Sequence, residues 1–96
     1  MLDKSAIASD FNRQGAEFLK VELKTGLTFA KIALGEEAGS EERFKNLANA
    51  RKAFQTVLRL RERFTSPNDA ATRDIQDALD RLRSALEELG ENVPRN

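Results

Sequence analysis

One carboxylate interrupts an otherwise apolar side of the helix that we predict near the N-terminus. Glu22 falls near Gly15, Gly26 and Phe29 when residues are placed at 100° steps. A carboxylate on an apolar side of a helix needs an ion-pair or hydrogen-bond partner. The alternative is that it lies in a cleft and acts there as an acid. The chain contains no His and no Cys that could act beside it. Antiparallel pairing of the first two predicted helices brings Glu22 level with Arg51, so we predict a structural Glu22–Arg51 ion pair.

Three further acids, Asp74, Asp77 and Asp80, recur at a spacing of three residues. Arginines stand between them, and a hydrated acidic face explains the pattern better than a metal site does. A carboxylate di-metal site in a helical bundle normally uses Glu-x-x-His, which a chain without His cannot supply. There is also no phosphate-binding glycine loop and no nucleophile with a candidate base. We therefore expect no enzyme, no cofactor and no metal.

Three segments with helical periodicity must position these residues. The chain has 96 residues, the length of one domain, with 40% hydrophobic and 33% charged residues. The periodic segments span about 10–34, 41–64 and 67–89. Helix-capping signals separate them: Ser9 or Asp10, then Gly35 to Ser40, then Ser66-Pro67, and finally Gly90. The sequence predicts an all-α, antiparallel up-down-up three-helix bundle forming a single domain over 1–96, with residues 1–9 and 91–96 as loose termini.

The first helix carries more apolar residues than a helix needs in order to pack against two neighbours in such a bundle. Its aliphatic sector suits the interior: Ala16, Leu19, Leu23, Leu27, Ala30 and Leu34. A second sector then remains, and an exposed apolar patch usually marks an interface. We predict that this patch is centred on Phe18, Val21, Phe29 and Ile32 and mediates a homodimer or binds a helix of another protein. The alternative is a skewed bundle that covers both sectors within one chain.

Charge is distributed unevenly along the chain, although 16 basic and 16 acidic residues cancel. Residues 41–64 carry seven basic and three acidic side chains, a net charge of +4, and residues 67–91 carry the opposite, a net charge of −4. The basic side of the second helix bears Lys45, Lys52, Arg59 and Arg63. A row of this kind could contact phosphates. A solvated face that complements the acidic helix is the favoured interpretation, because no aromatic residue interleaves the row.

Residues 49–90 resemble a helical hairpin of tetratricopeptide repeats. The resemblance is carried by Ala50 and Phe54 on one helix, the turn Pro67-Asn68-Asp69, and the closing Leu89-Gly90. The Trp, the Tyr and the 34-residue repetition of that family are missing here. The resemblance implies an interaction module that binds protein or peptide segments. It does not identify any site residues.

The function expected from these features is a small non-catalytic protein-interaction or self-assembly module. The alternative is a nucleic-acid accessory protein that uses the basic side of the second helix. The stretch Phe18–Leu34 is too charged and too short to span a bilayer, so we expect no membrane insertion. Met1–Asp10 contains acids and no apolar run, which favours a cytoplasmic location.

Overall fold

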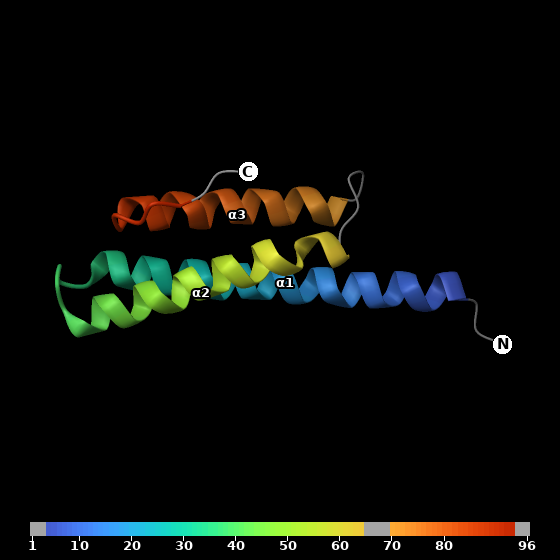
Figure 1. The fold of residues 1–96 in the computed structure, drawn as a ribbon, viewed down its shortest axis with the longest axis horizontal. Coiled ribbons are helices and arrows are strands. Elements are labelled where there is room, and N and C mark those ends of the chain that lie inside the picture. Colours follow the sequence, from blue (N-terminus) through green and yellow to red (C-terminus); the bar gives the residue numbers. More distant parts are fainter. Residues whose placement is uncertain (1–3, 65–69, 94–96) are drawn as a thin grey trace.

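A computed structural model describes residues 4–64 and 70–93, with side chains from residue 13 onward. It contains three helices, α1 (Lys4–Gly35), α2 (Glu41–Phe64) and α3 (Ala70–Glu88), and no strand in the described residues. Figure 1 shows the helices side by side along the length of the molecule, which measures 57 × 23 × 17 Å. The predicted all-α three-helix bundle is confirmed.

The helix ends follow the predicted capping chemistry. The hydroxyl oxygen of Ser40 accepts a hydrogen bond from the backbone N–H of Arg43 at 3.1 Å, which caps α2. Gly90 has φ 90°, and the N–H groups of Gly90 and Glu91 donate to the carbonyls of Glu87 and Leu86 at 2.9 and 3.0 Å. This is a Schellman ending of α3. The predicted start of the third helix at Pro67 lies outside the described residues.

The helix α1 begins earlier than the sequence indicated. We expected a start near Asp10 with residues 1–9 loose, but α1 already includes Lys4. The segment Ser5-Ala6-Ile7-Ala8 contains no helix breaker, so the helical periodicity continues through the expected cap. The other expected loose end, 91–96, also differs in part, because Val93 packs against the core. Residues 94–96 lie outside the described part.

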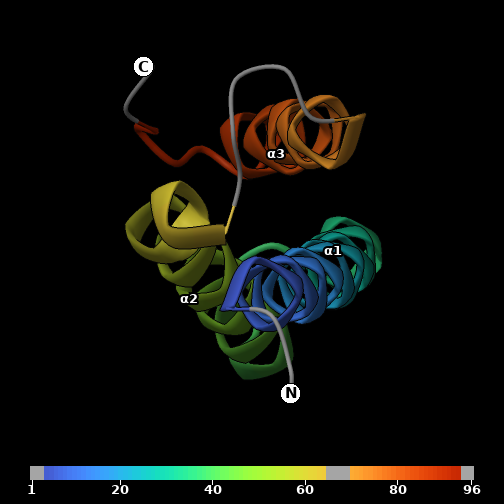
Figure 2. The same cartoon turned by 90° about the vertical axis from the view of Figure 1, so that its right-hand side faces the viewer.

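The end view in Figure 2 shows α1 beside both α2 and α3. The core is formed by side chains from one side of α1 together with side chains of α2 and α3. The fully buried side chains of the core include Leu19, Leu23, Val57, Ile75, Leu79, Leu82 and Leu86. The α3 residues among them repeat at spacings of four and three, which is the single buried stripe expected for a helix on the outside of the bundle.

The relative directions of the helices follow from which residues meet. Gly15 lies against Phe64 and Gly26 against Ala53, so contacts ascend along α1 while they descend along α2. The colours in Figure 1 show the same reversal. Since α2 ends beside Gly15, the N-terminal turns of α1 extend beyond the end of α2, as Figure 1 also shows.

Close packing of α1 against α2 depends on small residues. A Cβ atom at Gly26 would lie 2.8 Å from the Cβ of Ala53 and 3.0 Å from the Cδ2 of Leu82. Both distances are shorter than ordinary carbon–carbon contacts. Gly26 is therefore required for the close approach of the helices, not for an unusual backbone conformation.

This contact predicts that Gly26→Val lowers the free energy of unfolding by about 1–3 kcal/mol, the usual cost of overpacking. Gly35→Val is the matched control, because a Cβ at Gly35 meets nothing within 4 Å. We expect the control to change the free energy by less than about 0.5 kcal/mol. Urea titrations followed by circular dichroism measure both variants. Equal midpoints for the two would show that α1 and α2 are not tightly packed at Gly26.

Candidate functional site

The side of α1 that faces away from α2 and α3 carries large apolar side chains. Phe18, Val21 and Ile32 are 47%, 60% and 44% exposed. On the opposite side of the same helix, Leu19, Leu23 and Ala30 are at most 1% exposed. These three side chains therefore stay largely open to solvent, although α1 buries its opposite side in the core.

The exposed apolar residues belong to one line along the helix. Its members, which we call the outer seam, are all exposed and follow one another at spacings of four and three: Gln14, Phe18, Val21, Thr25, Thr28 and Ile32. That spacing keeps residues on one face of an α-helix. The outer seam is therefore a continuous surface, apolar at Phe18, Val21 and Ile32 and interrupted by short polar side chains.

Phe29 differs from the other three residues of the predicted patch. It is half-buried and packs against the core, at the edge of α1 nearest α2. There it lines a shallow hollow together with Glu22, Thr25, Lys52 and Thr56. Phe18, Val21 and Ile32 thus lie on the outer seam, whereas Phe29 lies beside it, at the edge of α1 that faces α2.

A second hollow, of about 300 Å³, lies beside the outer seam where α2 ends. It is lined by Gln14, Gly15, Phe18, Leu60 and Phe64. Leu60 and Phe64 are absent from the patch predicted from the sequence, because their nearness to Phe18 depends on how α2 crosses α1. The hollow extends the apolar surface of Phe18 onto the second helix.

The predicted basic row occupies one exposed side of α2. Lys52, Arg59 and Arg63 are exposed, and within residues 13–64 and 70–93 none of them forms an ion pair. Lys45 is also exposed, and its Nζ lies 3.2 Å from the Oε1 of Glu41 one turn earlier. The row is a solvated cationic surface next to the hollow that contains Glu22.

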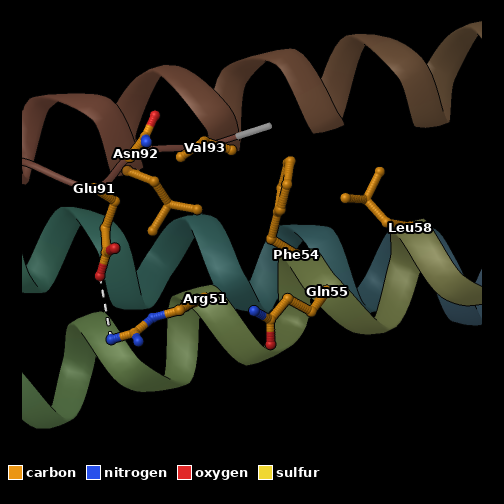
Figure 3. A pocket seen from close by; sticks show the side chains of 8 residues that line it. Arg51, Phe54, Gln55, Leu58, Glu91, Asn92 and Val93 are labelled. Atoms are coloured by element: carbon orange, nitrogen blue, oxygen red, sulfur yellow. Dashed lines mark ion pairs between the residues drawn. The ribbon is translucent and has the colours of Figure 1, made fainter. Parts of the chain in front are cut away.

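The predicted Glu22–Arg51 ion pair is not formed. The Nη2 of Arg51 lies 3.1 Å from the Oε1 of Glu91, just beyond the end of α3, and Figure 3 shows the two side chains meeting across a small hollow. Arg51 and Lys52 are consecutive on α2 and so point in directions about 100° apart. Lys52 lies near Glu22, which places Arg51 on the α3 side of the helix.

Two of the three regularly spaced acids on α3, Asp74 and Asp80, form ion pairs or hydrogen bonds with neighbouring side chains. Asp80 accepts from Arg83 at 2.9 Å and from Gln76 at 3.0 Å, and Asp74 lies 3.6 Å from the Nζ of Lys20. Arg83 also stacks over the ring of Phe54, with 5.7 Å from its Cζ to the ring centroid. Across residues 13–64 and 70–93, no group of three or more acids could hold a metal ion. These contacts orient α3 on α1 and α2.

Comparisons with protein families, with curated proteins and with solved structures found no match to this chain. The resemblance of residues 49–90 to a tetratricopeptide-repeat hairpin therefore stays a prediction. None of the helices in the described residues is both long enough and apolar enough to cross a membrane.

The position of Arg51 predicts the outcome of two double-mutant cycles. Combining Arg51→Met with Glu91→Gln should give a coupling of about 0.2–1 kcal/mol, since Arg51 is 42% and Glu91 25% exposed and solvent screens the pair. Combining Arg51→Met with Glu22→Gln should give no coupling beyond about 0.3 kcal/mol. Chemical denaturation of six proteins (the wild type, three single variants and two double variants) measures both cycles, and a repeat of the wild type at high salt tests the screening. A larger coupling to Glu22 would contradict the structure.

Proposed function

We propose that this protein is a small non-catalytic interaction module, whose contact surface is the outer seam of α1. The observation that carries the proposal is the exposure of Phe18, Val21 and Ile32 along one face of a helix whose other face forms the core. Single exposed apolar residues are normal on a protein surface, whereas an aligned set of them marks a contact surface.

Two features make the outer seam suitable for a helical partner. Residues at spacings of four and three present the anchor pattern with which one helix recognises another. The hollow at Gly15, Leu60 and Phe64 gives a large side chain of the partner a place to insert beside Phe18. Aromatic anchors in such pockets dominate the binding energy of many interfaces.

A second candidate function is nucleic-acid binding by the basic row of α2. It is supported by the exposure of Lys52, Arg59 and Arg63 on one side of the helix and by the absence of acidic partners for them in the described residues. Phosphate contacts by such a row would be independent of sequence and would weaken steeply with salt. The surface lacks exposed aromatic residues between the basic ones, so we rank this function second.

The proposed interaction predicts that Phe18→Glu abolishes association and leaves the fold intact. Phe18 is half-exposed, so its replacement should change the free energy of unfolding by less than about 1 kcal/mol. Phe44→Glu is the matched control, because Phe44 is 67% exposed on α2 and lies outside the outer seam. Sedimentation velocity over a range of concentrations, with circular dichroism beside it, measures association and folding separately.

We expect the wild type and Phe44→Glu to associate and Phe18→Glu to sediment as a folded monomer. A Phe18→Glu chain that unfolds would place Phe18 in the core and contradict the proposal. A wild type that stays monomeric at the highest concentration, and that gains no partner sensitive to Phe18→Glu, would do so as well.

The second candidate predicts a mobility shift of DNA or RNA at low salt that disappears with Lys52→Glu and Arg59→Glu. The same two variants should leave sedimentation unchanged if the outer seam alone mediates association. Absence of a shift at low salt would exclude this function for the basic row.

A further inference from the structure

The partner that best fits the outer seam is a second copy of the chain. We infer that the outer seams of two copies pair as an antiparallel two-stranded coiled coil, with Phe18 packed against Val21 of the partner subunit. This inference rests on the proposed function, because it assigns the occupant of the same surface.

The spacing assigns heptad positions to the whole of α1. Phe18, Thr25 and Ile32 take position a, and Gln14, Val21 and Thr28 take position d. The seam spans Gln14 to Ile32, almost three heptads, and α1 continues as a helix beyond its N-terminal end to Lys4.

One flank of the seam carries an acidic residue followed by two basic residues. Within the residues whose side chains are described, position g is occupied in turn by Glu17, Lys24 and Lys31. In an antiparallel pair, the g positions of one helix face the g positions of the other, and charges there set orientation. With Phe18 opposite Val21 of the partner subunit, Glu17 faces the partner's Lys24. Two-fold symmetry repeats this pair, so two pairs of opposite charge form across the flank.

Both neighbouring registers bring like charges together. Sliding one helix by one heptad in one direction brings Glu17 opposite Glu17 of the partner subunit. Sliding it in the other direction brings Lys24 opposite Lys24 of the partner subunit, while Glu17 then faces the partner's Lys31. Like charges in direct opposition are destabilising, so among these three registers the flank favours the one without a like-charge pair.

A parallel pair is disfavoured by the same residues. In a parallel coiled coil, position g faces position e of the next heptad on the other helix. Glu22 occupies position e, so Glu17 would face Glu22 of the partner subunit. Glu22 forms no ion pair within the described residues, whereas Glu17 lies 3.3 Å from the Nζ of Lys20, so the repulsion is offset at Glu17 only.

The polar members of the seam agree with the selected register. Gln14 comes opposite Thr25 of the partner subunit, so two polar side chains share a layer and can hydrogen-bond. Thr28 already donates its hydroxyl to the backbone carbonyl of Lys24 at 3.0 Å, and it can therefore face an apolar side chain without losing a partner.

Charge exchange across the flank tests the register. Lys24→Glu and Glu17→Lys should each raise the dimer dissociation constant on the order of tenfold, because each change turns two attractive pairs into repulsive ones. The double variant restores both pairs in reversed order and should return to within about threefold of the wild type. Arg81→Glu, an exposed change of the same charge on α3, is the control and should leave the constant unchanged. In a parallel dimer, Glu17→Lys would tighten association instead.

Disulfide trapping tests the same register independently, because the natural chain contains no Cys. A mixture of Phe18→Cys and Val21→Cys chains should form a disulfide-linked heterodimer on mild oxidation, and each variant alone should link weakly. A parallel pair would give the opposite result, since each variant would then link to itself. Phe44→Cys is the control for random collision and should not link above background.

The outcomes separate this inference from the proposed function. A wild-type dimer that is broken by Phe18→Glu but indifferent to Lys24→Glu, or not rescued by the double variant, overturns the register and leaves the proposed function standing. A wild-type monomer that binds another protein through Phe18 also overturns the inference alone. A wild-type monomer without any partner sensitive to Phe18→Glu overturns both.

Discussion

The close approach of α1 and α2 is the constraint on which the rest of the structure depends. Gly26 allows the backbone of α1 to reach Ala53, and a Cβ atom there would meet both α2 and α3. This contact fixes the rotation of α1 about its axis. Leu19, Leu23 and Ala30 are thereby buried, and Phe18, Val21 and Ile32 are turned away from the bundle. A helix that packs on two neighbours with one side has its opposite side free, so the outer seam is a consequence of how the core is built.

The two faces of α1 differ in the kind of contact that they can make. The buried face is aliphatic and joined to α2 through small residues, which suits permanent packing within a chain. The outer face alternates aromatic or aliphatic residues with Gln14, Thr25 and Thr28 and carries charges along one edge. Polar positions and flanking charges reduce the stability of a helix pair but specify its partner and its register. That composition is what a surface needs if it must remain soluble when alone and recognise one partner.

Ion pairs in this protein orient the helices more than they stabilise the bundle. Arg51–Glu91 holds the residues after α3 against α2, and Lys20–Asp74 joins α1 to α3. Both pairs are partly or largely exposed, so each contributes only about 0–1 kcal/mol. The sequence led us to pair Arg51 with Glu22, because antiparallel helices bring the two to the same level. Two residues at the same height along a helix pair can still point in different directions around their helix axes. The rotation of α2 about its own axis therefore decided which acid Arg51 contacts.

The sequence by itself determined the number of helices, the extent of α2, and the capped end of α3, because periodicity and capping residues such as Ser40 and Gly90 act over a few neighbouring residues. It also indicated Phe18, Val21 and Ile32 as surplus to a three-helix core. Only the tertiary structure decided that Phe29 is half-buried, that Leu60 and Phe64 form a hollow beside Phe18, and that Arg51 binds Glu91. These outcomes depend on crossing angles and on rotation about each helix axis, which are set by packing between residues far apart in the chain.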